Sequence, residues 1–119
     1  MVLSGTIGLT DDVDEKLKQL TKHFDYDSAK EMALFAFAYA VTENLSRYPV
    51  SNTETKWNFG SFSDKNDKAL DFEKILTICY PHEDEKNFEK IIVELIHAGV
   101  NEIYSRYSKD QYLSLIDLL

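Results

Sequence analysis

Glu94 and His97 are the pair of residues in this sequence whose spacing is most suggestive of chemistry, because they form a Glu-x-x-His motif within an apolar helical pattern. This spacing places two side chains on one face of a helix, and diiron bundles use it to hold metal. Such a site needs a second Glu-x-x-His pair and two more glutamates from facing helices. Neither His23 nor His82 has a glutamate three residues before it. We therefore expect no metal and no cofactor, and we expect His97 to be a core-edge or surface histidine.

Other residue types with catalytic potential also lack the partners that catalysis requires. Cys79, the single cysteine, lies beside Tyr80 in an apolar helical pattern, so we expect a small buried hydrophobic residue and not a nucleophile. His82 and the acidic run 83–85 could hold a hard cation, but acidic residues are also common in the first turn of a helix. The sequence contains no glycine-rich phosphate loop, no Gly-x-Ser-x-Gly elbow and no zinc-spaced cysteines or histidines. We predict that the protein is not an enzyme.

The composition is that of one globular domain. The 119 residues are 44% apolar and 29% charged, and only four glycines and two prolines occur, which favours helices over many short strands. Thirteen basic and 21 acidic residues give a net charge of −8, which repels phosphate. We therefore do not expect direct nucleic-acid binding. The sequence shows neither a signal-peptide pattern nor an apolar run of about 20 residues. We expect a cytoplasmic protein with no membrane partner.

Hydrophobic spacing predicts a mainly α-helical single domain over residues 1–119, arranged as a bundle of about five helices. The central helix is predicted at 28–45, where apolar residues leave almost no polar face, so that other helices must surround it. The remaining helices are predicted at 11–24, at 67–80, after the acidic run 83–85, and in the C-terminal YLSLIDLL, which follows a possible capping box at 108–111. Residues 1–9 predict an extended segment or one short strand. The predicted core includes Phe24, Phe35, Phe37, Tyr39, Leu76, Ile92, Leu95 and Ile96.

Residues 46–66 lack a regular apolar period and predict a long loop, which carries Trp57, Phe59 and Phe62. Two interpretations of these aromatic residues remain open. In the first, Trp57 and at least one of the phenylalanines fold back as a packed lid over the core. In the second, the three residues form a partner-binding surface, since aromatic side chains are enriched in interface cores.

Several segments resemble a family of small accessory proteins, the fourth of those associated with DNA phosphorothioation (Dnd) systems. In chain order these segments are SAKEMALFAFAYAV, YP, KWNFGSF, IIVELIHAGVNEI and YLSLIDLL. The likeness covers about residues 20–119. It departs from the family pattern at Ala40, where the family has glycine, and at 97–99, where His-Ala-Gly replaces Asn-Gly-Gly. The resemblance implies a prokaryotic, cytosolic setting in or beside a multi-protein system that modifies DNA or restricts phage, and it supplies no catalytic residues.

We therefore expect a non-enzymatic accessory or adaptor subunit whose partners are other proteins of the same system, with a homo-oligomer also possible. One alternative is an acidic immunity or inhibitor protein that binds a toxin or nuclease. Another is a DNA-binding regulator of the ribbon-helix-helix kind, because a short strand precedes two helices. Against the regulator, residues 1–15 contain four acidic residues and no lysine or arginine, whereas a DNA-reading ribbon needs donors and positive charge.

Overall fold

The computed structural model describes residues 5–59 and 72–118. Most of its elements are helices. In chain order the elements are β1 (Thr6–Leu9), α1 (Asp11–His23), α2 (Ala29–Thr42), β2 (Glu54–Asn58), α3 (Phe72–Cys79) and α4 (Phe88–Lys109), with 3-10 helices at Glu85–Asn87 and Leu115–Leu118. The expectation of a mainly α-helical, compact domain is confirmed. No helix within the described ranges is both long enough and apolar enough to cross a membrane.

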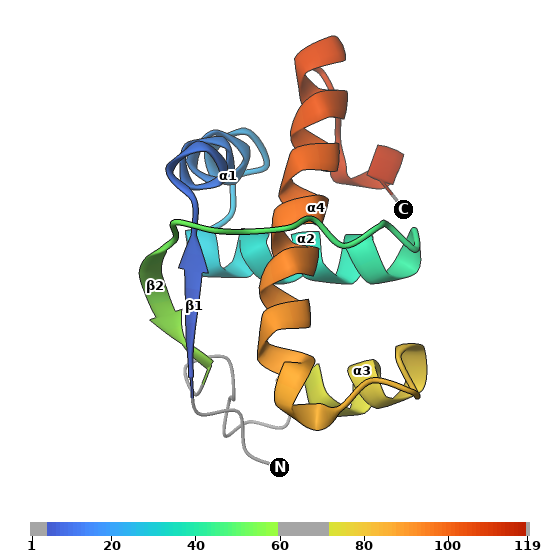
Figure 1. Cartoon of the computed structure of the whole chain (residues 1–119). Coiled ribbons are helices and arrows are strands. Elements are labelled where there is room, and N and C mark those ends of the chain that lie inside the picture. Colours follow the sequence, from blue (N-terminus) through green and yellow to red (C-terminus); the bar gives the residue numbers. More distant parts are fainter. Residues whose placement is uncertain (1–4, 60–71, 119) are drawn as a thin grey trace.

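Helix α4 is the element around which the others are arranged. It stands upright in Figure 1, crosses α2, and also contacts α1, α3 and β1. Its buried residues run along most of its length, from Phe88 to Ile103. The central position predicted for α2 is therefore shared with α4. One side of α2 stays open to solvent at Ala38, and Val41 is only partly buried.

The first two helices begin where side chains satisfy the free amide groups of the first turn. Thr10 caps α1 by accepting a hydrogen bond from the amide of Val13 at 3.3 Å. Ser28 caps α2 by accepting one from the amide of Glu31, also at 3.3 Å. Helix α1 then presents a buried apolar stripe to the core. Its residues are Val13, Leu17 and Leu20.

A two-stranded antiparallel sheet corrects the prediction of a continuous loop over 46–66. Strand β2 occupies part of that range and pairs with β1, with a register shift between Ile7 and Gly8. The paired residues are Thr6 with Asn58, Ile7 with Trp57, Gly8 with Thr55 and Leu9 with Glu54. The sequence of β2 shows no apolar period because most of its side chains are exposed. Its order comes instead from pairing with a strand far away in sequence.

The expectation of about five helices is not confirmed, because four α-helices are present in the described residues. The C-terminal YLSLIDLL forms only the 3-10 helix Leu115–Leu118. Asp110 is not the start of a further helix but the C-cap of α4, and its carboxylate accepts a hydrogen bond from the amide of Tyr112 at 3.0 Å. In so short a segment, local hydrogen bonds alone do not offset the free-energy cost of helix nucleation. The carboxylate of Asp117 instead accepts hydrogen bonds from the amide and hydroxyl of Ser114 at 3.0 and 3.2 Å.

The predicted core residues differ in how deeply they are buried. The fully or nearly fully buried ones are Phe37, Tyr39, Leu76, Ile92, Leu95 and Ile96. Phe24 and Phe35 are only partly buried and pack against the edge of this core. Phe24 is the C-cap of α1, where its ring lies 4.7 Å from that of His23, and the Phe35 ring lies 6.3 Å from that of Tyr26. Both rings thus cover the junction between α1 and α2.

Candidate functional site

Glu94 and His97 lie on α4 as predicted, but their side chains have separate structural partners. The Glu94 carboxylate accepts a hydrogen bond from Nε of Arg47 at 2.9 Å and forms an ion pair with Nη2 of the same residue at 2.7 Å. His97 is fully buried, which corrects its expected place at the core edge or surface. Its Nε2 accepts a hydrogen bond from the amide of Thr10 at 3.2 Å, and its Nδ1 lies 2.8 Å from the carbonyl oxygen of Val93. Both ring nitrogens are therefore occupied by backbone groups.

The hydrogen bonds of His97 fix its protonation. Because the Thr10 amide donates to Nε2, the ring must carry its proton on Nδ1, which then donates to Val93. Burial lowers the pKa of His97 below its ordinary value, and the hydrogen bond to Val93 opposes this only in part. The neutral imidazole thus joins α4 to the residue that caps α1. Among the described residues, no cluster of three or more His, Cys, Asp or Glu side chains could hold a metal.

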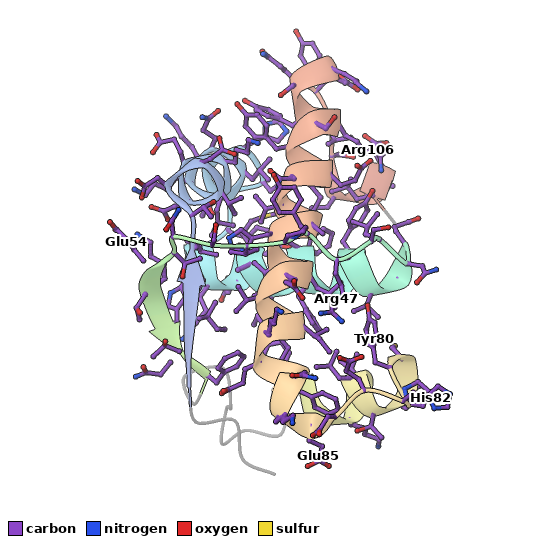
Figure 2. The ribbon with its side chains drawn as sticks, viewed as in Figure 1. Arg47, Glu54, Tyr80, His82, Glu85 and Arg106 are labelled. Atoms are coloured by element: carbon purple, nitrogen blue, oxygen red, sulfur yellow. The ribbon has the colours of Figure 1, made fainter. Side chains whose placement is uncertain are left out.

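Arg47 connects the segment after α2 to α4 and to Glu83 in the α3–α4 connection. Besides its contacts with Glu94, its Nη1 lies 3.8 Å from the carboxylate of Glu83. Figure 2 shows Arg47 beside α4, with Tyr80 at the end of α3 nearby. Two carboxylates share one guanidinium, so the cluster retains a net negative charge. Its geometry is that of a structural ion-pair network that holds the segment after α2 against α4.

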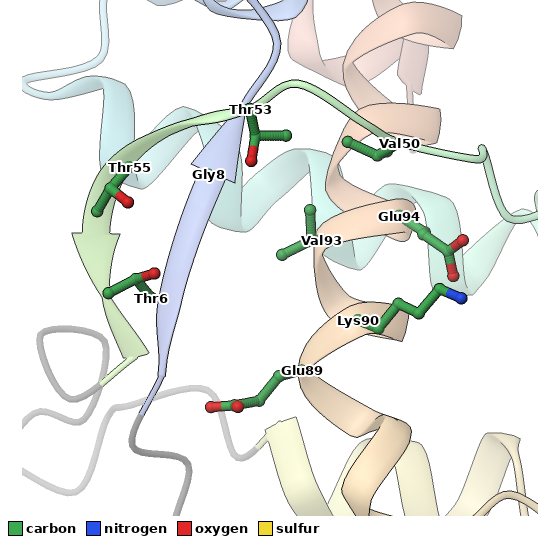
Figure 3. A pocket seen from close by; sticks show the side chains of 9 residues that line it. All are labelled: Thr6, Gly8, Val50, Thr53, Thr55, Glu89, Lys90, Val93 and Glu94. Atoms are coloured by element: carbon green, nitrogen blue, oxygen red, sulfur yellow. The ribbon is translucent and has the colours of Figure 1, made fainter.

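A hollow of about 230 Å³ lies between the sheet and α4 (Figure 3). Its lining residues are Thr6, Gly8, Val50, Thr53, Thr55, Glu89, Lys90, Val93 and Glu94. Glu89 and Val93 extend toward the strands in Figure 3, whereas Lys90 and Glu94 extend away from them. The Glu89 carboxylate accepts a hydrogen bond from the amide of Gly5 at 2.6 Å, and Glu94 is paired with Arg47. Both carboxylates of the hollow therefore stabilise the fold.

A second, apolar hollow of about 320 Å³ lies between α2 and α3, and we name it the α2–α3 groove. Its lining residues are Phe37, Ala38, Val41, Thr42, Ile75, Ile78 and Cys79. Ile78 is 71% exposed, and Ala38 and Cys79 are also exposed. An adjoining hollow is lined by Ala40, Val41, Asn44, Cys79 and Tyr80, and it extends the groove to the carboxyl ends of both helices.

The exposure of Cys79 corrects the expectation that this residue is buried. Phe72 and Leu76 of α3 contact the core. Figure 1 shows the carboxyl end of α3 extending away from the amino-terminal end of α4. Cys79 is the last residue of the helix, so it lies beyond this contact. The sequence contains a signal for the groove that the prediction of a surrounded helix missed. Helix α2 is apolar on nearly all sides, and the elements in residues 5–59 and 72–118 leave one of those sides exposed at Ala38.

The aromatic residues of the predicted loop have different environments. Phe59 is only 1% exposed, and its ring meets that of Phe72 edge to face at 6.2 Å. Trp57 lies in β2, opposite Ile7, and packs half-buried against the core. Phe62 lies outside the described residues. Burial of Phe59 agrees with the interpretation as a packed lid and leaves this ring inaccessible to a partner.

Strand β1 is not arranged as the strand of a ribbon-helix-helix protein would need to be. It pairs within the chain, and the side chains of Ile7 and Leu9 are buried. Lys56 is the one cation in the two strands, and it lies 3.0 Å from the carboxylate of Asp14. The sheet therefore presents little free positive charge to a phosphate backbone.

Comparisons of the chain with protein-family models, curated proteins and solved structures found no match. Surface chemistry is then the remaining guide to function. The α2–α3 groove is the best candidate site, because its exposed apolar side chains are not buried in the core.

Proposed function

We propose that this protein is a non-enzymatic accessory or adaptor subunit that acts through protein–protein contacts, with the α2–α3 groove as the contact surface. The observation that carries the proposal is the 71% exposure of Ile78 at the edge of an apolar groove. Contiguous apolar surface of this kind marks sites of interaction more often than isolated exposed side chains do. The groove replaces Trp57, Phe59 and Phe62 as the proposed centre of the interface, although half-buried Trp57 can still contribute.

The biological setting of the proposal comes from the sequence resemblance. Segments across residues 20–119 resemble the accessory proteins of DNA phosphorothioation systems. We propose that the partners are other proteins of a prokaryotic DNA-modification or anti-phage defence system in the cytoplasm. An adaptor needs a folded core and an accessible surface but no reacting groups, which fits the structural use of Glu94, His97 and Arg47.

Exchange of Ile78 for asparagine tests the proposal. Since the side chain is exposed, Ile78→Asn should change the free energy of unfolding by no more than about 0.5 kcal/mol. The variant should nevertheless lose the DNA-modification or restriction proteins that co-purify with the wild type from the native host. Ile116→Asn is a matched control, because Ile116 is 78% exposed in the 3-10 helix that Figure 1 draws on the other side of α2. Equal recovery of these partners with Ile78→Asn and wild type would rule out the groove as the contact surface.

A further inference from the structure

We infer that the α2–α3 groove binds one amphipathic helix of a partner protein, and that this helix carries basic residues where it crosses the carboxyl ends of α2 and α3. The inference rests on the proposed function and adds the chemical class of the partner.

The walls of the groove favour a helix over an extended peptide. Among the described residues they are side chains of two helices, and neither strand contributes to them. An extended peptide would find no sheet edge here and would leave its backbone groups unpaired against apolar walls, whereas a helix satisfies its own backbone. Small Ala38 permits close approach, and Val41 and Ile78 offer contacts for apolar residues spaced three and four apart.

Charge at one end of the groove indicates a basic partner. Figure 1 shows α2 and α3 running in the same direction, so their carboxyl ends lie together. Neither helix has a basic residue in its last turn, and exposed Glu43 directly follows α2. The dipoles of the two helices also place partial negative charge at their carboxyl ends. Arg47 does not offset this charge, because it already pairs with Glu83 and Glu94.

The same charge argues against a second copy of this chain as the occupant. A second copy would bring the same acidic helix ends and a net charge of −8, so that the two molecules would repel each other. A basic helix would instead be attracted to the groove before its apolar side makes contact. The occupant is therefore a different protein.

Two synthetic helical peptides provide the test. Both carry the same leucines at positions i, i+3, i+4 and i+7, but one has lysine and the other glutamate at its polar positions. Fluorescence anisotropy of the labelled peptides at low salt should show binding of the lysine peptide to the full chain at least about tenfold tighter than that of the glutamate peptide. Ile78→Asn should weaken binding of the lysine peptide at least about tenfold. Glu43→Gln should weaken it severalfold, while Glu15→Gln, an exposed change on α1, should not.

Each contrary result has a defined meaning. Equal binding of the two peptides, no binding of either, or indifference to Ile78→Asn would overturn the inference. If Ile78→Asn still abolishes co-purification of native partners in that case, the proposed function stands and only the class of partner is wrong. A wild type that sediments as a dimer, with Ile78→Asn a monomer, would identify a second copy as the occupant and would also overturn the inference.

Discussion

Gly99 in α4 lies so close to Ala36 in α2 that a Cβ atom at position 99 would come within 2.1 Å of the Ala36 carbonyl oxygen. This contact occurs at the crossing of the two helices, which share the most extensive helix–helix interface of the described fold. The neighbouring atom belongs to the backbone of a helix, so it cannot rotate away as a flexible side chain could. The distance between α2 and α4 is therefore set by the absence of a side chain at residue 99.

Gly99→Ala should destabilise the protein, although alanine is normally the better helix former. Higher helix propensity would contribute about 1 kcal/mol of stabilisation. Separation of the two helices should cost more, leaving a net loss of about 2 kcal/mol. Urea unfolding followed by circular dichroism measures this change. Ser105→Ala, an exposed change in the same helix, is the control and should not destabilise the chain. An unchanged urea midpoint for Gly99→Ala would contradict the close crossing.

His97 should make stability depend on pH just below neutrality. Its pKa is lowered in the folded state by burial, so below about pH 6.5 the unfolded chain binds a proton that the folded chain does not. The free energy of unfolding should therefore be highest above pH 6.5. It should decrease as the pH is lowered from 6.5 to the folded-state pKa of His97. Urea unfolding between pH 8 and pH 5 provides the measurement. His97→Gln should lose stability at pH 8 but show a smaller fall toward pH 5.

The control for that experiment is His82→Gln, because His82 is exposed. This variant should keep the wild-type dependence of stability on pH. If His97→Gln and wild type fall in parallel, another group is responsible for the dependence.

Arg47→Ala should cost about 2 kcal/mol, because the Glu94 carboxylate would remain nearly buried without its guanidinium partner. Replacing Glu94 with glutamine in the Arg47→Ala background should recover part of this loss, since the uncompensated charge is removed. A double-mutant cycle from urea unfolding separates the pair interaction from the single effects. Additive losses would show that the two residues do not stabilise the fold as a pair.

Phe59→Ala should be more destabilising than Trp57→Ala. The Phe59 ring is 1% exposed and meets Phe72 in the core, so its removal should cost about 3 to 5 kcal/mol. Because Trp57 is only half-buried, Trp57→Ala should lower the free energy of unfolding by less. Thermal unfolding of both variants checks the order. The reverse order would mean that Trp57, and not Phe59, is the main cover of the core.

The sequence predicts the helices well because their signals are local. The predicted range 11–24 matches α1 within one residue at each end, and the predicted range 28–45 begins one residue before α2 but ends three residues after it. The apolar run in α2 indicates burial but not its direction. It therefore could not show that Ala38 would remain exposed.

Other features depend on contacts between residues far apart in the chain. Strand β2 forms because β1 lies beside it, and no pattern within residues 54–58 specifies that partner. The Glu-x-x-His spacing correctly places Glu94 and His97 on one helix. Their actual partners, Arg47 and the Thr10 amide, precede Glu94 and His97 by 47 and 87 residues in the chain. Periodicity cannot reveal such pairings, which decide that this pair is structural.

The central place of α4 also has a consequence for the order of events during translation. The elements β1, α1 and α2 leave the ribosome before residues 88–109 have been made, yet each of them contacts that helix in the folded protein. The nascent chain must therefore carry the side of α2 that packs against α4 uncovered until α4 has been made. Because transiently exposed apolar surface promotes aggregation, we expect chaperone demand to be greatest just before α4 emerges.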